Sequence, residues 1–230
     1  MGLFQNILEL DKDLFLYLNG FHNDFWDTIM LMVTRKETWL PFYLVIIYYF
    51  IKNYRNKSWL ILLLLAGTIL ASDQISVLIK ETVERLRPAH EPEIESLVHN
   101  VLRKGGLYGF VSSHAANSFA IYVFTSRIFK NRSYSILLLF WALLVTYSRI
   151  YSGVHYPLDV IGGALVGCAF GYGFYKLLIF LETHFLLARQ PKVEKTKLLS
   201  TDAGIIWLVF LVLMATVFIS SGILHYYGYL

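Results

Sequence analysis

The chain has 230 residues, of which 57% are hydrophobic and only 16% are charged, and its formal net charge is +4. A soluble domain carries about a quarter charged residues, so this composition excludes an ordinary soluble protein and favours an integral membrane protein. The positive charge is too small and too scattered to indicate a nucleic-acid-binding protein. In a membrane protein, excess Lys and Arg mark the cytoplasmic loops.

The N-terminal residues 1–37 are amphipathic rather than continuously apolar. Five charged residues interrupt the apolar pattern: Asp11, Lys12, Asp13, Asp24 and Asp27. A cleavable signal peptide is therefore not predicted. The pattern instead predicts interfacial amphipathic helices that lie along the membrane surface, although part of residues 24–33 could extend the first membrane span.

Six apolar windows follow this segment, and a helix that spans a bilayer needs about 20 residues. The windows cover residues 38–53, 58–80, 114–130, 134–151, 158–184 and 204–227. The predicted fold is therefore all-α, a polytopic membrane helix bundle of about six transmembrane helices with N-terminal interfacial amphipathic helices.

The loops between the windows alternate in character. One set is basic and contains Lys52, Arg55, Lys57, Lys130, Arg132, Arg189, Lys192, Lys195 and Lys197. If the six spans alternate in direction, these loops share one side, which positive charge marks as cytoplasmic. The long connection 81–113 and the turn 149–157 then face the outer side, where three polar clusters gather.

The first polar cluster ends the second window. Lys80 and Arg87 are seven residues apart, about two helical turns, so both project from one face if the helix continues that far. Pro88 then ends the helix. Basic side chains also snorkel at the ends of membrane helices, so this cluster alone does not decide its role.

The second cluster, Ser112, Ser113 and His114, opens the third window. Serines before an apolar run are typical helix N-caps. The free backbone N–H groups at such a helix start also bind anions. By itself, His114 is more typical of a structural or interfacial histidine than of a catalytic one.

The third cluster lies between the fourth and fifth windows and contains Arg149, His155 and Asp159. Pro157 suits the first turn of a helix. A carboxylate four residues after a histidine can accept its ring N–H and fix the tautomer, which leaves the other nitrogen free for attack. A plain polar turn explains Pro157 but not three ionisable residues beside apolar spans.

Together the clusters supply three cations, two histidines, a carboxylate and a helix start on one face of the membrane. Cations and N–H donors stabilise the charge of a phosphoryl group. Two histidines and an acid suit nucleophilic attack and protonation of a leaving group. Phosphoryl transfer is therefore the predicted chemistry.

The three clusters, in order, resemble the motifs of the type 2 phosphatidic acid phosphatase family of membrane lipid phosphatases. The first motif, Lys-x6-Arg-Pro, is complete from Lys80 to Pro88, and the third, Ser-Arg-x5-His-x3-Asp, is complete from Ser148 to Asp159. The second motif, Pro-Ser-Gly-His, reads Val-Ser-Ser-His at residues 111–114. The resemblance spans roughly residues 38–184.

The resemblance implies a role for each matching residue. His155 is the expected nucleophile, which forms a phosphohistidine, and Asp159 orients it. His114 is expected to protonate the leaving oxygen and then to activate water. The phosphate-binding residues implied are Lys80, Arg87, Arg149, Ser112 and Ser113. Because Ser113 replaces a glycine, a side chain lies where backbone would approach the oxyanion, and a reduced or altered activity is expected.

The family works without a metal, so the resemblance implies no metal and no cofactor. The cations near both histidines also disfavour a metal ion. The expected partner is a membrane lipid substrate, with no nucleic acid and no obligatory protein partner. The expected location is the cell (inner) membrane, with the active site on the outer, periplasmic face.

The leading predicted function is hydrolysis of a terminal phosphate of undecaprenyl diphosphate. The alternatives are phosphatidylglycerophosphate and lipid A as substrates. Related haloperoxidases hold vanadate with the same residues but are soluble, which disfavours that activity here. A non-catalytic lipid-binding or transport protein is a further alternative, but it needs polar residues near the bilayer midplane.

The predicted organisation has three parts: an interfacial segment at 1–37, a catalytic core at 38–184, and a C-terminal part at 185–230. The last combines a basic cytoplasmic loop with an additional transmembrane helix. Within the core, Asp73 lies seven residues before Lys80 and is interpreted as a buried structural partner. Gly162, Gly163 and Gly167 are predicted to serve close helix packing.

Overall fold

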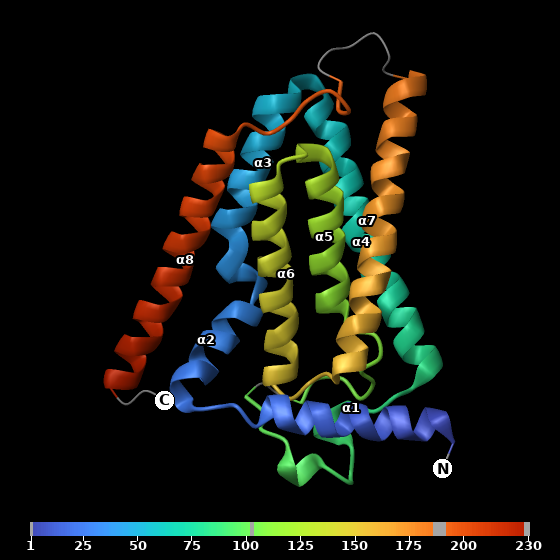
Figure 1. Cartoon of the computed structure of the whole chain (residues 1–230), viewed down its shortest axis with the longest axis vertical. Helices are drawn as coiled ribbons and strands as arrows, with labels where there is room; N and C mark the ends of the chain where they lie inside the picture. Colours follow the sequence, from blue (N-terminus) through green and yellow to red (C-terminus); the bar gives the residue numbers. More distant parts are fainter. Residues whose placement is uncertain (1, 102–103, 186–191, 228–230) are drawn as a thin grey trace.

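The fold is a bundle of upright helices with one helix laid across its end (Figure 1). The computed structural model describes residues 2–101, 104–185 and 192–227. Its α-helices are α1 (Leu3–Asn19), α2 (Asp24–Thr34), α3 (Leu40–Tyr54), α4 (Ser58–Val83), α5 (Ser113–Phe129), α6 (Arg132–Tyr151), α7 (Pro157–Phe185) and α8 (Ser200–Tyr226). Short 3-10 helices are η1 (Lys36–Trp39), η2 (Arg55–Lys57), η3 (Pro88–His90) and η4 (Glu95–Leu97). The predicted all-α membrane bundle is confirmed.

All six predicted spans are helical, but their suitability for crossing a membrane differs. In the described residues, four helical stretches are long and apolar enough: Lys36–Val83, Arg132–Tyr151, Pro157–Phe185 and Ser200–Tyr226. Helix α5 has 17 residues and is more polar. It packs against α4, α6 and α7, so much of its surface contacts protein rather than lipid.

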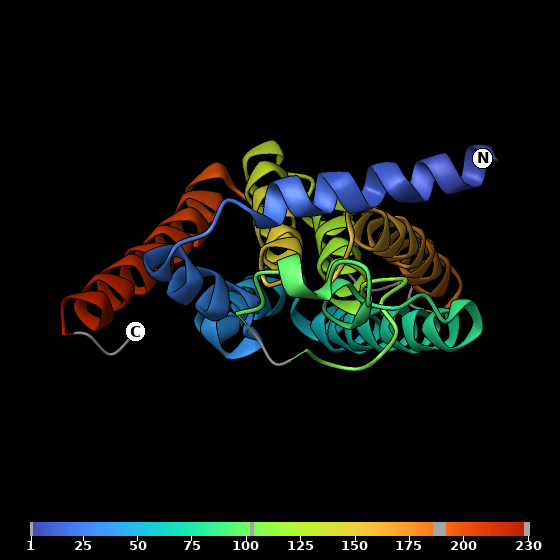
Figure 2. The ribbon, with the colours of Figure 1, turned by 90° about the horizontal axis from the view of Figure 1, so that it is seen from below.

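Helix α1 lies across the lower end of the bundle in Figure 1, and Figure 2 shows it extended over the helix ends from below. Helix α2 instead rises towards α3 and packs against α6 and α8. The Asn23 side chain caps α2 by accepting a hydrogen bond from the Trp26 backbone N–H at 3.0 Å. Of the two N-terminal helices, α1 thus has the orientation of an interfacial helix.

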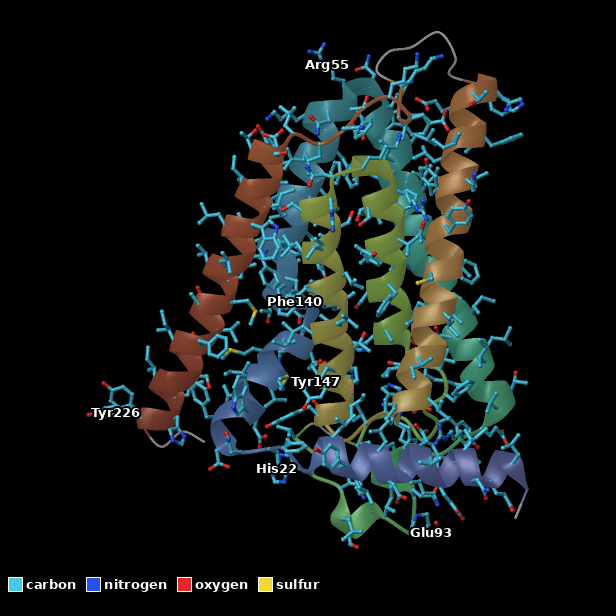
Figure 3. The ribbon with its side chains drawn as sticks, in the orientation of Figure 1. His22, Arg55, Glu93, Phe140, Tyr147 and Tyr226 are labelled. Atoms are coloured by element: carbon cyan, nitrogen blue, oxygen red, sulfur yellow. The ribbon has the colours of Figure 1, made fainter. Side chains whose placement is uncertain are left out.

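The long helices alternate in direction, so their connections gather at two opposite ends. Figure 3 shows Arg55, between α3 and α4, at the upper end and Glu93, in the long connection after α4, at the lower end. The α5–α6 turn and the segment before α8 lie with Arg55 (Figure 1). The basic connections therefore share one end, as predicted; Arg189 lies outside the described residues.

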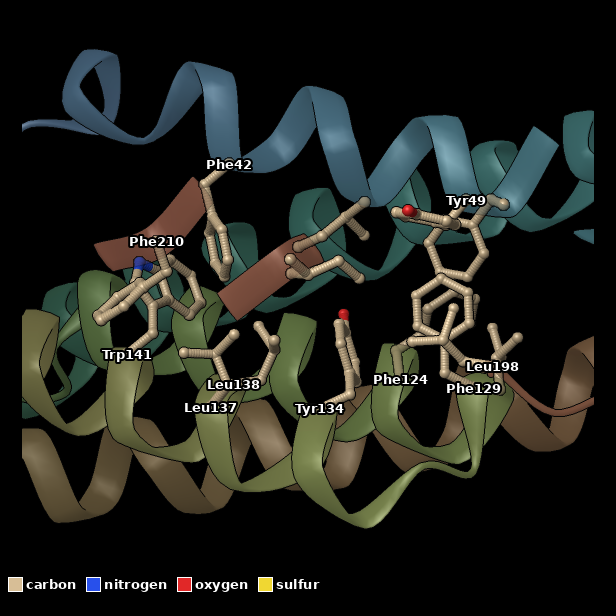
Figure 4. Close-up of a cluster of buried hydrophobic side chains, with 14 of the residues drawn as sticks. Phe42, Tyr49, Phe124, Phe129, Tyr134, Leu137, Leu138, Trp141, Leu198 and Phe210 are labelled. Carbon is tan, nitrogen blue, oxygen red and sulfur yellow. The ribbon is translucent and has the colours of Figure 1, made fainter. Parts of the chain in front are cut away.

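A core of buried hydrophobic side chains, many of them aromatic, joins α3, α5, α6 and α8 (Figure 4). Phe50 of α3 stacks on Phe129 of α5 with ring centroids 4.4 Å apart. Trp39 stacks on Phe210 of α8 at 5.7 Å. Because lipid tails are as apolar as these side chains, specific packing rather than burial alone holds membrane helices together. Each such aromatic pair contributes about 0.5–1.5 kcal/mol beyond its buried area.

Small residues allow α7 to approach α5 closely. A Cβ atom added at Gly163 would lie 2.4 Å from the Ser112 carbonyl oxygen, and one at Gly167 would lie 2.1 Å from the Ala116 carbonyl oxygen. At Gly162 it would lie 2.8 Å from a methyl group of Val111. The prediction of close packing at these three glycines is confirmed, and this packing sets the start of α5 beside the start of α7.

Candidate active site

The fold brings the three polar clusters together at the lower end of the bundle. Lys80 lies in the last turn of α4, Ser113 begins α5, Arg149 lies in the last turn of α6, and Asp159 lies in the first turn of α7. The Ser112 backbone N–H donates to the Asp159 carbonyl oxygen at 2.9 Å. The second and third clusters are therefore joined directly through the backbone.

His155 and Asp159 form a fully buried pair. His155 Nδ1 lies 3.4 Å from Asp159 Oδ2, and the two side chains are 2% and 0% exposed. The same carboxylate oxygen accepts the Tyr156 backbone N–H at 3.0 Å, which fixes its position. A Cβ atom at Gly109 would lie 2.8 Å from that oxygen, so only glycine fits there. The predicted orientation of His155 by Asp159 thus has a matching geometry.

Lys80, Arg87 and Arg149, the cation cluster, have no carboxylate partner among the described residues. Lys80 Nζ donates to Ser113 Oγ at 2.7 Å, and Arg87 Nε donates to the Tyr108 carbonyl oxygen at 3.0 Å. Arg149 is 7% exposed and donates to the Thr34 hydroxyl. All three act electrostatically on His155. Cations that are partly or wholly buried without a counter-ion form a site for an anion.

The N-terminus of α5 adds neutral donors to the cation cluster. Ser112 is the N-cap residue, and its hydroxyl is buried without a hydrogen-bond partner in the described part of the chain. The Ser113 hydroxyl, which replaces the family's glycine, is held by Lys80 instead of projecting freely. A helix N-terminus with an unused hydroxyl is suited to bind phosphate oxygens.

His114 is exposed, unlike His155, and lines a cavity of about 620 Å³. Ser113 lines the same cavity, which extends between α3, α4, α5 and α6 and has mainly apolar walls. The positive charges of Arg149, Arg87 and Lys80 all act on His114. Because His114 is the residue predicted to protonate the leaving oxygen, we call this space the leaving-group cavity.

Two residues that sequence reasoning missed complete the surroundings of His155. Arg85 donates to Asp159 Oδ1 at 3.1 Å and to Asp11 Oδ2 at 2.6 Å. The other oxygen of Asp11 accepts the Leu158 backbone N–H at 2.9 Å. Asp11 thereby fixes the start of α7 from helix α1. Arg85 lies inside the first motif, but nothing in the sequence indicates that Asp11 would meet it.

Burial shapes the protonation of these groups. Desolvation holds the pKa of His155 well below its usual value, and the positive charges of Arg87, Arg149 and Lys80 lower it further. The imidazole is therefore neutral at neutral pH and keeps a lone pair. Desolvation also raises the pKa of Asp11, although hydrogen bonds from Arg85 and Leu158 oppose this shift. Desolvation lowers the pKa of Arg87.

Comparison with known proteins identifies the family. The model of the PAP2 superfamily matches residues 60–182, the part of the chain that carries all three clusters. The chain belongs to the PAP2 superfamily. Within the described residues, no group of three or more His, Cys, Asp or Glu side chains could hold a metal ion.

Curated relatives of this PAP2 protein carry lipid phosphatase names. It is 40% identical to a lipid A 4'-phosphatase of Bacteroides thetaiotaomicron over 79% of this chain and 80% of the relative. A lipid A 4'-phosphatase of Porphyromonas gingivalis is 35% identical over 80% of each chain. The undecaprenyl-diphosphatase BcrC of Bacillus subtilis is 25% identical over 73% of this chain and 83% of the relative.

A solved structure has the same fold as this PAP2 protein. The crystal structure of Aquifex aeolicus LpxE matches with a TM-score of 0.58 and 26% identity, over 73% of this chain and 95% of that one. The predicted membrane lipid phosphatase, a hydrolase of phosphoric monoesters, is confirmed by these relationships.

Proposed function

We propose that this protein removes a phosphate monoester from an acylated sugar lipid of the lipid A type, through a phosphohistidine on His155. The observation that carries this proposal is the cation cluster, which lies without carboxylate partners beside a neutral histidine and next to the leaving-group cavity. Two relatives, 40% and 35% identical over about four fifths of the chain, are named lipid A 4'-phosphatase.

In the first step, the free ring nitrogen of His155 attacks phosphorus and the bond from phosphorus to the lipid oxygen breaks. Asp159 faces Nδ1, so it stabilises the positive charge that develops on the ring. The bound phosphate offsets the positive charges around His114, so its ring can hold a proton. His114 transfers this proton to the departing oxygen, which leaves as an alcohol. Lys80, Arg87 and Arg149 stabilise the charge on the phosphoryl oxygens, together with Ser112 and the start of α5.

In the second step, water replaces the lipid. His114, now neutral, takes a proton from water, and the resulting oxygen attacks the phosphohistidine. The bond from phosphorus to nitrogen breaks, inorganic phosphate leaves, and His155 returns to its neutral form. All bonds and protons then balance with water as the only further reactant. Because the resemblance implies no metal, we expect activity to survive EDTA.

The substrate proposal differs from the leading interpretation of the sequence. The sequence favours undecaprenyl diphosphate, with phosphatidylglycerophosphate and lipid A as alternatives. The comparisons favour lipid A without excluding undecaprenyl diphosphate. A sugar phosphate has a poor leaving group, an alcohol oxygen, and so depends on an acid. The exposed position of His114 at the leaving-group cavity supports this assignment.

We also propose that the site faces the outer, periplasmic side of the inner membrane. The basic connections gather at the opposite end of the bundle (Figure 3), and positive charge marks the cytoplasmic side. Single cysteines in a Cys168→Ser background test this orientation. A cysteine at Glu93 should react with an impermeant thiol reagent in intact cells, and cysteines at Lys130 and Lys195 should be protected; the opposite pattern contradicts it.

Phosphate release by the purified protein tests the substrate. We expect the highest kcat/KM with an acylated glucosamine 4-phosphate, and lower values with undecaprenyl diphosphate and phosphatidylglycerophosphate in the same micelles. A preference of tenfold or more for either of the other lipids contradicts the proposal. Water-soluble phosphate esters should be poor substrates, because they lack the tail that partitions into lipid.

A further inference from the structure

The leaving-group cavity contains two polar side chains that the proposed hydrolysis does not use. Asn117 lies one helical turn beyond Ser113 on α5, Asp73 lies on α4, and both line the cavity. Asn117 Nδ2 donates to Asp73 Oδ1 at 3.4 Å, a long hydrogen bond that is weak by its geometry. Asn117 Oδ1 has no partner among the described residues. Most of the hydrogen-bonding capacity of this pair is therefore unused.

The depth of this polar pair is unusual. Asp73 lies seven residues before Lys80, about 10 Å along the helix axis, and inside the membrane-spanning stretch Lys36–Val83. The sequence suggested a buried structural partner, but Asp73 is only half-buried and faces the cavity. An acid inside a span that lines an accessible cavity marks a substrate path more often than a structural contact.

The walls around the pair are aromatic and carry a further unused donor. Trp39, Tyr43 and Trp141 all line the cavity. Trp141 is 1% exposed, and its ring N–H has no acceptor in the described part of the chain. A buried, unpartnered donor is costly unless a ligand completes it. The cavity thus offers apolar faces together with both donors and acceptors of hydrogen bonds.

We infer that the leaving-group cavity is a sugar subsite, in which Asp73 and Asn117 bind hydroxyl or amide groups of the ring that carries the scissile phosphate. This inference rests on the proposed function and names the part of the substrate that is recognised. With phosphate in the cation cluster, the ring follows His114 into the cavity. The carboxylate of Asp73 accepts from hydroxyl or amide hydrogens, and Asn117 both donates and accepts.

The same pair disfavours a prenyl tail in this position. A hydrocarbon chain would cover Asp73 and Asn117 without offering them partners, and burial of unpaired polar groups is costly. A site built to hydrogen-bond a substrate group therefore discriminates strongly against an analogue that lacks the group. In this way one polar pair separates sugar-linked from prenyl-linked phosphates.

The competing explanation is that the Asp73–Asn117 hydrogen bond only clamps α4 to α5. The variants Asp73→Asn and Asn117→Ala distinguish the two, assayed with an acylated glucosamine 4-phosphate and with undecaprenyl diphosphate. We expect kcat/KM for the sugar phosphate to fall roughly 10- to 100-fold through a higher KM, while activity on the diphosphate is unchanged or rises. Thr68→Val, on α4 but outside the cavity lining, is the matched control and should leave kcat/KM unchanged for both substrates.

An equal loss on both substrates, a loss on neither, or a loss confined to the diphosphate overturns the subsite. Binding separates this result from a failure of the proposed function. In a His155→Ala background, Asp73→Asn should weaken the measured affinity for the intact sugar phosphate about tenfold. If binding of the sugar phosphate depends on Asp73 but the wild-type protein does not hydrolyse it, the subsite stands and the proposed function fails. If the wild-type protein hydrolyses the sugar phosphate but binding does not depend on Asp73, the proposed function stands and the subsite fails.

Discussion

The two ends of the bundle treat their cations differently. At the upper end, Lys57 Nζ lies 2.6 Å from Glu182 Oε1, Lys52 lies 3.0 Å from Asp202, and Lys130 donates to the carbonyl oxygen of Val193 at 3.1 Å. At the lower end, the cation cluster of Lys80, Arg87 and Arg149 has no carboxylate partner among the described residues. Arg85, also at the lower end, is paired with Asp11 and Asp159, so the contrast concerns the cation cluster. Cations paired with carboxylates indicate a structural role, and unpaired convergent cations indicate a ligand.

Acidic residues follow the same division. At the upper end, Glu182 also accepts the Val193 backbone N–H at 2.9 Å, so its charge secures the connection to α8. At the lower end, Asp159 is shared between Arg85 and His155, and it contacts no member of the cation cluster through a hydrogen bond that the structure describes. The carboxylate orients the histidine and leaves the cations available for phosphate.

The largest expected effect is at the lower end, at the proposed nucleophile. His155→Ala should abolish turnover and labelling of the protein with phosphate, because no other described group holds the same position. His114→Ala should reduce kcat for a sugar phosphate by roughly 10²–10⁴-fold, the usual contribution of a general acid. Steady-state rates and trapping of the phosphoenzyme measure both effects.

His184→Ala is the matched control for these two variants. His184 is exposed at the opposite end of α7, and the hydrogen bond described for it is local, to the Phe180 carbonyl oxygen. The variant should retain full activity. Near-normal turnover of His155→Ala would remove the phosphohistidine mechanism altogether.

A smaller loss of activity is expected when Asp11 of helix α1 no longer shares Arg85 with Asp159. Asp11→Asn leaves Arg85 with Asp159 as its only carboxylate partner among the described residues, so Arg85 should compete more strongly with His155 for that carboxylate. We expect kcat to fall roughly 10- to 100-fold, the effect of losing one or two charge-assisted hydrogen bonds. Single-turnover phosphoenzyme formation measures the step directly.

Asp13→Asn provides the comparison on the same helix, since Asp13 is exposed, and it should leave the rate unchanged. Asp11→Glu should restore part of the activity if the carboxylate positions Arg85. Equal rates for Asp11→Asn and wild type would show that α1 has no part in positioning the histidine.

The upper end should respond in stability rather than in activity. Glu182→Gln leaves Lys57, which is 3% exposed, without its counter-charge, and breaking a buried ion pair costs about 3–5 kcal/mol. The free energy of unfolding in mixed micelles should fall by about that amount, while kcat per folded molecule is unchanged. Glu95→Gln breaks the exposed pair with Lys104 and should cost less than about 1 kcal/mol. Similar losses of stability in the two variants would contradict a structural role for the buried pair of Lys57 and Glu182.

From the sequence we could predict the main polar residues of the candidate site at the lower end, but not all of the residues that surround them. Lys80, His155 and Asp159 were recognisable because a helix end and a short turn place them locally. Arg87 lies beyond the end of α4 at Val83, so the expectation that this helix continues to Pro88 is wrong. Arg87 is held instead by the loop, where its backbone N–H donates to the Leu107 carbonyl oxygen at 3.0 Å.

Asp11 and Arg85 meet only because α1 crosses the bundle end, a tertiary arrangement that no local pattern encodes. Helix α5 can be more polar than the other helices because α4, α6 and α7 pack around it. Apolar windows in the sequence do not contain this information, so they could not settle how many helices cross the membrane.

The smallest expected effect is a shift in pH dependence, which tests whether the cation cluster acts on the nucleophile. Burial, followed by the charges of Arg87, Arg149 and Lys80, lowers the pKa of His155. Neutral His155 is the attacking form, so kcat/KM should stay constant as pH falls through 6.5 and decline only at lower pH.

The variant Arg87→Gln tests this effect of the cations. It removes one positive charge, and the loss of that charge stabilises the protonated ring of His155 and raises its pKa. The acid limb should therefore move to higher pH, by on the order of one unit or less, in addition to the loss of phosphate binding. Substrate phosphate also titrates in this range, with a pKa of about 6, but it does so equally for both proteins, so the difference between their profiles reports the enzyme. Lys104→Gln removes an exposed charge that does not act on His155 and should leave the limb in place. A limb that stays fixed in Arg87→Gln would mean that the cations bind phosphate without tuning the histidine.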